Sequence, residues 1–328
     1  MITAKGLLKV VHSMKLIKKT SLSFFFILRY YNTEMGDSML LADKWKDYEL
    51  LDTSKGMKLE RWGNVVLLRP DPQVIWNNGD LLEKYHERID AVYHRSNKGG
   101  GHWENLKDIP SSWTIKYNDL TFNIKQMGFK HTGLFPEQAV NWDFMIDKIR
   151  NSKREIKVLN LFAYTGGATV ACLSAGASVT HVDSSRGMVD WCKENVKSSG
   201  YQDASIRYLV DDVVKFVERE IRRGNKYDAI IMDPPSYGRG ANGEVWDIEK
   251  NLNYLIEKCS EILADKPLFF LINYYTTGLS STVLSNLLEL NINSKYPGKV
   301  TCGEVGIPIK ENNLVLPCGI YGRWEENE

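Results

Sequence analysis

The sequence predicts an α/β protein with a doubly wound, mostly parallel sheet that ends in an antiparallel hairpin, preceded by a small α+β module. Two observations predict the large sheet. From residue 157 onward, short apolar runs alternate with helical patterns, as in a parallel sheet whose strands are joined by right-handed helical crossovers. The end of the chain differs, because runs 300–309 and 314–324 are separated only by a loop that contains Asn312 and Asn313, which favours a hairpin.

Residues 1–34 are predicted to lie outside the fold. They carry six Lys or Arg and one Glu, with a short apolar run over 22–28. They contain neither a small-residue cleavage site after that run nor the roughly 20 apolar residues of a membrane span. Met35, followed by Gly-Asp-Ser, has the context of a conventional start. We therefore interpret residues 1–34 as an extraneous or disordered leader.

A small α+β module is predicted over residues 43–130. Short apolar runs separated by Gly, Ser and Asn turns predict antiparallel strands, and one stretch with apolar residues at helical spacing predicts a helix. The expected elements are strands 48–51, 58–62 and 65–69, a helix over 80–94, and a hairpin of 113–117 with 120–124.

The larger domain is predicted over residues 131–328. Its expected strands are 157–163, 178–183, 205–210, 227–233 and 267–275. Its expected helices are 167–175, 185–199, 213–223, 248–264 and 280–290. Strands of this kind, each followed by a helix, place their carboxyl ends at one edge of the sheet, where ligands bind in such folds.

The first strand of this domain leads into a glycine turn, and the second stops at Asp183. A strand, a glycine turn and a helix N-terminus let backbone N–H groups approach a ligand, and an acid at the tip of the next strand can bind the two hydroxyls of a ribose. Residues 163–168 read Ala-Tyr-Thr-Gly-Gly-Ala, without the G-x-G-x-x-G spacing that seats a pyrophosphate. The pattern therefore argues against a nicotinamide-dependent dehydrogenase.

A second motif, Asp233-Pro-Pro-Ser-Tyr237, follows a later strand. Its prolines cannot continue the strand and so fix the direction of the loop. Together with the glycine turn and Asp183, it resembles the class I S-adenosylmethionine (SAM)-dependent methyltransferases. Residues 121–290 resemble, in particular, short members of the bacterial family that contains the 23S rRNA cytosine-C5 methyltransferases.

The resemblance implies a Rossmann-like methyltransferase sheet, SAM as the cofactor and an RNA substrate similar to rRNA. A protein or small-molecule acceptor, or a non-catalytic SAM-binding protein, is the alternative. The resemblance also implies roles for single residues. Asp183 is expected to bind the ribose and Asp212 to approach the adenine amino group, while Asp233 and Tyr237 are expected to position the acceptor. The candidate cofactor-binding residues are Thr132, Phe135, Asn160, Phe162, Ala163, Tyr164, Thr165, Gly166, Asp183, Ser184, Asp212 and Asp233. The candidate catalytic residues are Asp233, Pro234 and Tyr237.

One position departs from the cytosine-C5 enzymes, which attack the base with a Cys thiolate placed shortly before a Gly-Leu pair. Aligning Gly278-Leu279 puts Thr276 at that position, and none of the five cysteines lies at the end of the fourth or fifth strand. We therefore expect no cysteine nucleophile. The cysteines also lack C-x-x-C spacing, which fits reduced thiols in the cytoplasm, and the histidines show no metal-ligand spacing.

The charge of the chain bears on its partners. Its net charge is +1, but beyond residue 34 there are 36 basic and 40 acidic residues. A slightly acidic body creates no overall field that attracts nucleic acid. Contact with RNA would therefore need a local basic patch, and no contact with a membrane is expected.

Overall fold

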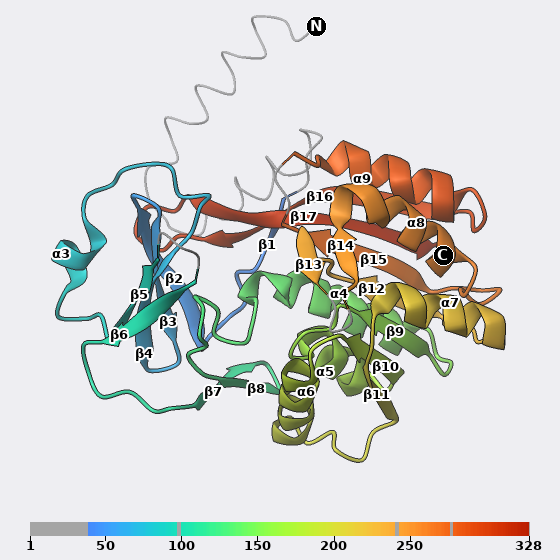
Figure 1. Cartoon of the computed structure of the whole chain (residues 1–328), viewed down its shortest axis with the longest axis horizontal. Coiled ribbons are helices and arrows are strands. Elements are labelled where there is room, and N and C mark those ends of the chain that lie inside the picture. The colour runs from blue at the N-terminus through green and yellow to red at the C-terminus, as the bar shows by residue number, and fades with distance from the viewer. Residues whose placement is uncertain (1–38, 97–99, 240–242, 276–277, 328) are drawn as a thin grey trace, which may run out of the picture. The chain divides into compact units, whose positions relative to one another are not determined.

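The computed structural model describes residues 39–96, 100–239, 243–275 and 278–327. The chain from Leu40 onward forms one compact unit (Figure 1). The predicted leader, residues 1–34, lies outside the described residues. Within the described residues, no helix has the length and apolar character needed to cross a bilayer.

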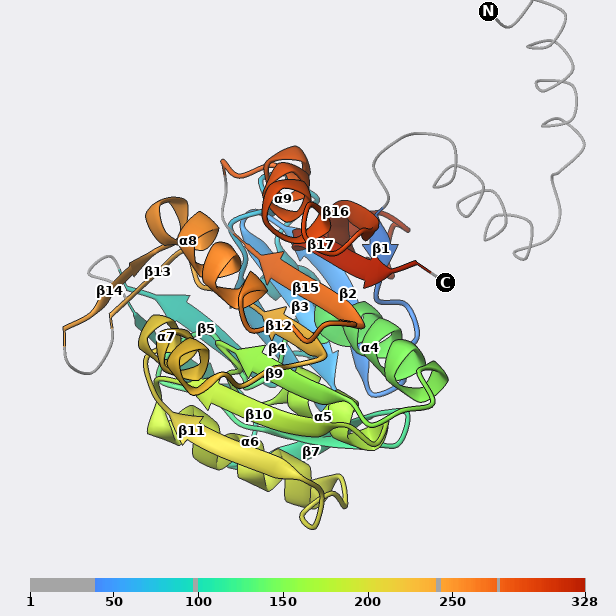
Figure 2. The ribbon, with the colours of Figure 1, turned by 90° about the vertical axis from the view of Figure 1, so that its right-hand side faces the viewer.

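The central element is an eight-stranded sheet with the order β1-β16-β17-β15-β12-β9-β10-β11 (Figure 2). Five strands are parallel neighbours in its centre and on one side: β9 (Lys157–Leu161), β10 (Ser178–Asp183), β11 (Ile206–Val210), β12 (Ala229–Met232) and β15 (Phe269–Tyr274). The strand β17 (Val315–Glu326) runs antiparallel to both β15 and β16 (Gly298–Pro308). The predicted doubly wound sheet with its terminal hairpin is confirmed.

Helices cover both faces of this sheet, and the strand sequences show why. Successive side chains of a strand point to opposite faces. Val158 accordingly packs in the same apolar core as α4 (Ala139–Asn151), α5 (Gly167–Ser174) and α6 (Arg186–Ser198). Leu159 packs in the core on the other face, with α7 (Val213–Arg223), α8 (Ile248–Ser260) and α9 (Ser281–Leu288). A π-helical turn, η2 (Glu289–Asn293), continues α9.

The N-terminal part forms a second, five-stranded sheet with the order β2-β3-β4-β5-β6. Its strands are β2 (Tyr48–Ser54), β3 (Met57–Trp62), β4 (Val65–Pro70), β5 (Ala91–Arg95) and β6 (Gly101–Asn105). The predicted hairpin is present as β7 (Trp113–Tyr117) and β8 (Leu120–Ile124). One apolar core contains Trp62 and Leu67 of this sheet as well as Trp142 and Val158 of the larger domain. The boundary between a 43–130 module and a 131–328 domain stays a prediction.

The prediction of a helix over 80–94 was wrong in its second half. The helix α3 spans only Leu81–Tyr85, begun by the Asp80 side chain, which accepts from the backbone N–H groups of Leu82 and Glu83. Residues Ala91–Arg95 form a strand instead, because they pair with β4 on one side and β6 on the other. These long-range partners outweigh a local pattern of apolar residues.

Two further pairings were not predicted from the sequence. The short strand β1 (Leu40–Leu41) adds to the edge of the large sheet beside β16. The strands β13 (Tyr237–Arg239) and β14 (Val245–Asp247) form a hairpin directly after the Asp-Pro-Pro-Ser motif. This hairpin matters for the site, because it holds that motif in place.

Candidate active site

A cavity opens at the carboxyl ends of β9, β12 and β15. This is the edge of a parallel α/β sheet at which ligands bind. Seven of the predicted site residues line it: Phe135, Asn160, Phe162, Ala163, Tyr164, Thr165 and Asp233. Its polar lining also includes Gln138 and Asn273, which sequence reasoning missed because neither stands in a recognisable motif. Among the described residues, no three His, Cys, Asp or Glu side chains gather closely enough to hold a metal ion.

The loop between β9 and α5, residues 162–166, shapes one wall of the cavity. Phe162, Tyr164 and Gly166 all have positive φ, at 53°, 51° and 84°. A Cβ at Gly166 would overlap Sγ of Cys192, so only glycine fits this turn without a shift. The Thr165 hydroxyl donates to the Gly133 carbonyl at 2.5 Å. These contacts fix the backbone that faces the cavity.

Asp183 braces the same loop from the end of β10. Its Oδ2 accepts from the backbone N–H of Tyr164 at 2.8 Å, and its Oδ1 accepts from that of Ser185 at 2.8 Å. Burial raises the pKa of this carboxyl, and the two N–H groups act against that shift. Each carboxylate oxygen has two acceptor positions, so one remains on each oxygen for a ribose hydroxyl.

Asp183→Ala is expected to weaken SAM binding by about 1.5–3 kcal/mol, the range for hydrogen bonds to a charged group. Isothermal titration calorimetry measures it directly. Asp183→Asn is the matched control, because it keeps one acceptor oxygen and should lose less affinity. Unchanged SAM affinity in a folded Ala variant, or tighter binding of NAD than of SAM by the wild type, would overturn the assignment.

Seven predicted residues do not line the cavity: Gly166 and Asp183, described above, and five others. Asp212 caps α7 by accepting from the backbone N–H of Lys215 at 2.9 Å, and Ser184 is exposed. Pro234 is buried, whereas Tyr237 is 55% exposed. Thr132 is fully buried. Their roles toward SAM or the acceptor stay predictions. Thr276, the position expected in place of the family's cysteine, lies outside the described residues.

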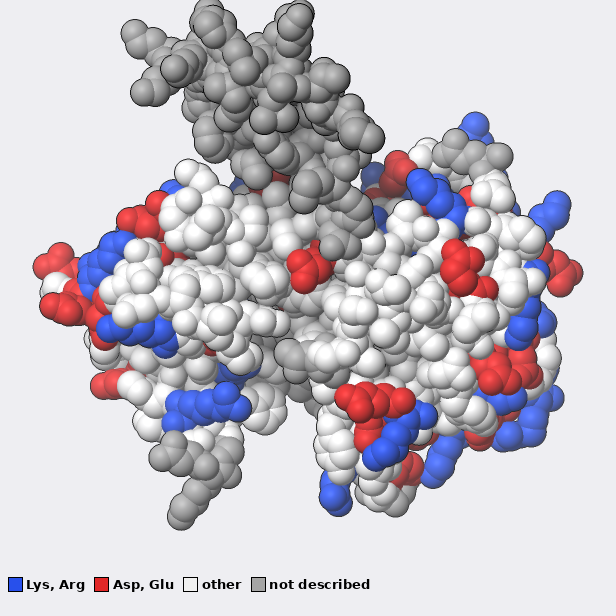
Figure 3. All heavy atoms as spheres, turned by 90° about the horizontal axis from the view of Figure 1, so that it is seen from above, with Lys and Arg blue, Asp and Glu red and all other residues white. Residues whose placement is uncertain are grey.

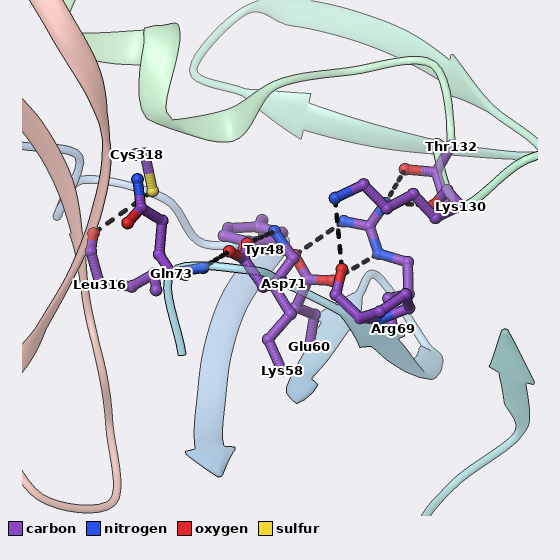
Figure 4. A network of polar contacts seen from close by, with 11 residues as sticks. Tyr48, Lys58, Glu60, Arg69, Asp71, Gln73, Lys130, Thr132, Leu316 and Cys318 are labelled. Atoms are coloured by element: carbon purple, nitrogen blue, oxygen red, sulfur yellow. Dashed lines mark hydrogen bonds and ion pairs between the residues drawn. The ribbon is translucent and has the colours of Figure 1, made fainter. Parts of the chain in front are cut away.

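Thr132 belongs to a segment that the N-terminal sheet holds in place (Figure 4). Arg69 of β4 donates to the Lys130 carbonyl at 2.8 Å, and its Nη1 lies 3.5 Å from the Thr132 hydroxyl oxygen. The other side of the guanidinium donates twice to the Glu60 carboxylate, at 2.6 and 2.8 Å, and both partners are buried. Arg69 therefore fixes the residues directly before Gly133 and the cavity-lining Leu134 and Phe135.

Asp233 follows β12, and its Oδ1 is buried with no hydrogen-bond partner in the described structure. Burial, together with the nearby charge of Glu137, raises the pKa of Asp233 to about 8. A buried acceptor left unpaired is costly, which is typical of a group that meets a ligand.

A polar network borders Asp233. The Gln138 amide donates to the Tyr275 hydroxyl at 2.9 Å and, in the amide orientation that satisfies both side chains, to the Asn273 oxygen at 2.8 Å. Asn141 donates to the Gln138 oxygen at 2.8 Å and accepts from Arg323 at 2.7 Å. This network holds the amide groups of Gln138 and Asn273 in fixed orientations at the cavity wall.

The β13–β14 hairpin fastens the Asp-Pro-Pro-Ser motif. The indole of Trp246 on β14 donates to the Pro235 carbonyl at 2.6 Å. The same ring packs against Phe162 of the glycine loop, with ring centroids 4.9 Å apart. Trp246 thereby links the two motifs that the sequence singled out, although no local pattern marks it as part of the site.

A buried polar cluster lies behind the glycine loop. Asn160 donates to the Thr169 hydroxyl at 2.9 Å, and that oxygen lies 2.9 Å from Nδ1 of His181. Burial lowers the pKa of His181 to about 3, and its Nε2 has no hydrogen-bond partner in the described structure. His181 is therefore neutral in the folded protein at any pH well above 3.

His181 should make the fold sensitive to acid. The unfolded chain takes up a proton on this residue near pH 6.5, whereas the native state does so only near its pKa of about 3. The contribution of His181 to the free energy of unfolding is therefore fully present above pH 6.5, and it decreases as the pH falls below 6.5. Between pH 7.5 and 5 the loss is roughly 2 kcal/mol. Urea denaturation at both pH values should show a smaller loss for His181→Gln, and the same loss as wild type for His86→Gln, an exposed control.

Comparisons with known proteins agree with this geometry. Residues 68–273 match the family model described as S-adenosylmethionine-dependent methyltransferase. The chain is 33% identical to a solved SAM-dependent methyltransferase from Agrobacterium tumefaciens, with a TM-score of 0.82 over 90% of this chain and 97% of that one.

Two curated relatives carry names that refer to ribosomal RNA. The chain is 24% identical to ribosomal RNA large subunit methyltransferase K of Neisseria meningitidis serogroup B, over 85% of this chain and 76% of that protein. It is 25% identical to ribosomal RNA large subunit methyltransferase K/L of Shewanella frigidimarina, over 68% of this chain. The matched part is 30% of that protein, so the chain spans less than a third of this relative's length.

Proposed function

The chain belongs to the S-adenosylmethionine-dependent methyltransferase family, and we propose that it transfers the methyl group of SAM to a nucleotide of RNA in the cytoplasm. The family membership and the cofactor predicted from the glycine turn, Asp183 and the Asp-Pro-Pro-Ser-Tyr motif are confirmed. The RNA substrate is supported by the names of the two relatives that act on large-subunit ribosomal RNA.

The residues of the cavity fit SAM. The methyl group of SAM is already activated by its sulfonium, so the protein has mainly to bind and orient the reactants. The glycine loop, residues 162–166, offers backbone groups for the methionine end. Asp183 ends the neighbouring strand, β10, and its free acceptor positions suit the hydroxyls of a ribose.

The observation that carries the proposal is the unpartnered carboxylate oxygen of Asp233. It can accept a hydrogen bond from an N–H group of the acceptor and so aim the lone pair of that nitrogen at the methyl group. Only the ionised carboxylate has both oxygens free to accept, so this role needs Asp233 deprotonated. Phe135 and Tyr164 line the same cavity as Asp233, with ring centroids 5.5 Å apart, and aromatic rings of this kind suit a planar base.

No cysteine has a place in this chemistry. None of the five lines the cavity, and burial raises the pKa of all five thiols, which disfavours the reactive thiolate. This supports the expectation, drawn from the missing family cysteine, that methyl transfer proceeds without a covalent enzyme–base intermediate.

The test is methyl transfer from SAM labelled on its methyl group. Total RNA from a strain that lacks the gene should accept label, whereas RNA from the parent strain, already methylated, should not. Mass spectrometry of the digested RNA then identifies the nucleoside. Label found only in protein or in small molecules would contradict an RNA acceptor, and SAM binding without transfer to any fraction would contradict an enzyme.

A further inference from the structure

Resting on the proposed function, we propose that a basic rim of the cavity, formed by Arg95, Phe129 and Lys130, binds single-stranded RNA that flanks the acceptor nucleotide. The body of the protein is slightly acidic, so such contact needs a local excess of positive charge. Figure 3 shows one face of the molecule, on which Lys and Arg are interspersed with Asp and Glu.

A continuous series of aromatic contacts leads from the cavity to the basic rim. Phe135 lines the cavity, and the ring of His131 meets it edge-on at 5.4 Å between centroids. Phe129 in turn meets His131 edge-on at 6.2 Å, and is 53% exposed. A single exposed apolar side chain is ordinary. One that ends a series of ring contacts leading out from the cavity offers a platform on which a neighbouring base can stack.

Positive charge surrounds this platform. Burial lowers the pKa of Lys130, and the charges of Lys58, Arg69 and Arg95 lower it further, while the charge of Asp71 opposes them. The acids in the cluster, Glu60 and Asp71, are already paired with Arg69 and Lys58.

Two of these cations remain available to a ligand. Arg95 is exposed and makes no ion pair within the described residues, and the Lys130 ammonium donates only a 3.3 Å hydrogen bond to the Pro70 carbonyl. Arg95 and Lys130 are therefore free to meet phosphate.

The segment that carries Phe129 and Lys130 is fastened to the N-terminal sheet and to the glycine loop. The indole of Trp103 on β6 donates to the Met127 carbonyl at 2.9 Å, and the Tyr164 hydroxyl of the glycine loop contacts the Met127 sulfur at 3.5 Å. Arg69 holds the Lys130 carbonyl. Burial and the neighbouring cations lower the pKa of His131 to about 4, so at neutral pH its ring packs as an uncharged aromatic. Exposed aromatic rings beside cations are the means by which proteins bind single-stranded nucleic acid.

The test uses a fluorescently labelled 20-nucleotide single-stranded RNA of mixed sequence, titrated with the full chain and followed by anisotropy. Phe129→Ala is expected to weaken binding about tenfold, in line with the loss of one stacked base. Arg95→Ala should also lower the slope of log affinity against log salt by about 0.7, the value for one phosphate contact to a single strand. Both variants should keep a SAM affinity within twofold of wild type. If these side chains only supported the fold, SAM binding would weaken together with RNA binding.

The matched controls are Leu290→Ala and Arg222→Ala, which remove an exposed apolar and an exposed cationic side chain on η2 and α7. Equal RNA affinity in the rim variants and these controls would overturn the proposal, as would equally tight binding of a 20-base-pair RNA duplex. If the rim variants lose RNA binding while the wild type methylates no RNA, the RNA-binding role of the rim is supported and the proposed acceptor is wrong. If the wild type methylates RNA but the rim variants bind RNA normally, the proposed function is supported and the RNA-binding role of the rim is wrong.

Discussion

Asp233→Asn is expected to lower kcat at least about 100-fold while the Kd for SAM stays within a few fold. The carboxylate oxygen of Asp233 has no partner in the cavity, so its hydrogen bond forms only with the acceptor. An interaction made mainly in the transition state affects kcat far more than cofactor binding. Single-turnover kinetics with labelled SAM and calorimetry of SAM binding measure the two quantities. A variant that keeps wild-type turnover, or one that loses SAM binding in parallel, would contradict this role.

The pH dependence of turnover provides a second check on Asp233. Burial and the charge of Glu137 raise the pKa of Asp233 to about 8, and the active form in this scheme is the ionised one. Activity of the wild type should therefore rise with pH toward this value, and the rise should be absent from the residual activity of Asp233→Asn. Glu137→Gln removes a negative charge, so it should move the midpoint to lower pH. If the pH midpoint of turnover is the same in Glu137→Gln and wild type, the charge of Glu137 does not raise the pKa of Asp233.

Arg69→Met is expected to lower the free energy of unfolding by about 3–5 kcal/mol, the cost of removing one partner from a buried ion pair. The other partner is the carboxylate of Glu60, whose side chain is fully buried. The variant also frees the Lys130 carbonyl and with it the segment that leads to Phe135 at the cavity. SAM binding should therefore weaken even at temperatures where the variant is folded. Urea denaturation and calorimetry measure the two effects.

Lys84→Met is the matched control for Arg69→Met. Lys84 pairs at 3.0 Å with Asp52, another fully buried carboxylate of the N-terminal sheet, but makes no hydrogen bond or ion pair with residues 125–135. The substitution Lys84→Met should lower the free energy of unfolding and leave SAM affinity unchanged. In Glu60→Leu with Arg69→Leu, apolar replacement of both partners should recover stability but not SAM affinity. Equal SAM affinities in Arg69→Met and Lys84→Met would show that Arg69 does not position the segment.

The sequence by itself determined the architecture of the large domain. Its strands are short apolar runs buried on both faces, its helices have clear spacing, and turns separate them, so each element is encoded within its own residues. The terminal hairpin follows from two apolar runs with no helix between them. The glycine turn and the Asp-Pro-Pro-Ser-Tyr motif were likewise readable, because turn chemistry depends on a few adjacent residues.

Only the tertiary structure decided the features whose partners are distant in the chain. Ala91–Arg95 is a strand because β4 and β6 flank it. Thr132 packs in the interior beside Arg69, more than sixty positions away, and Gln138 and Asn273 meet at the cavity wall from different elements. Side-chain direction and burial at such positions depend on which remote segments pack there. A local pattern carries no record of those segments, and this is the physical reason that the sequence located the site but not all of its lining.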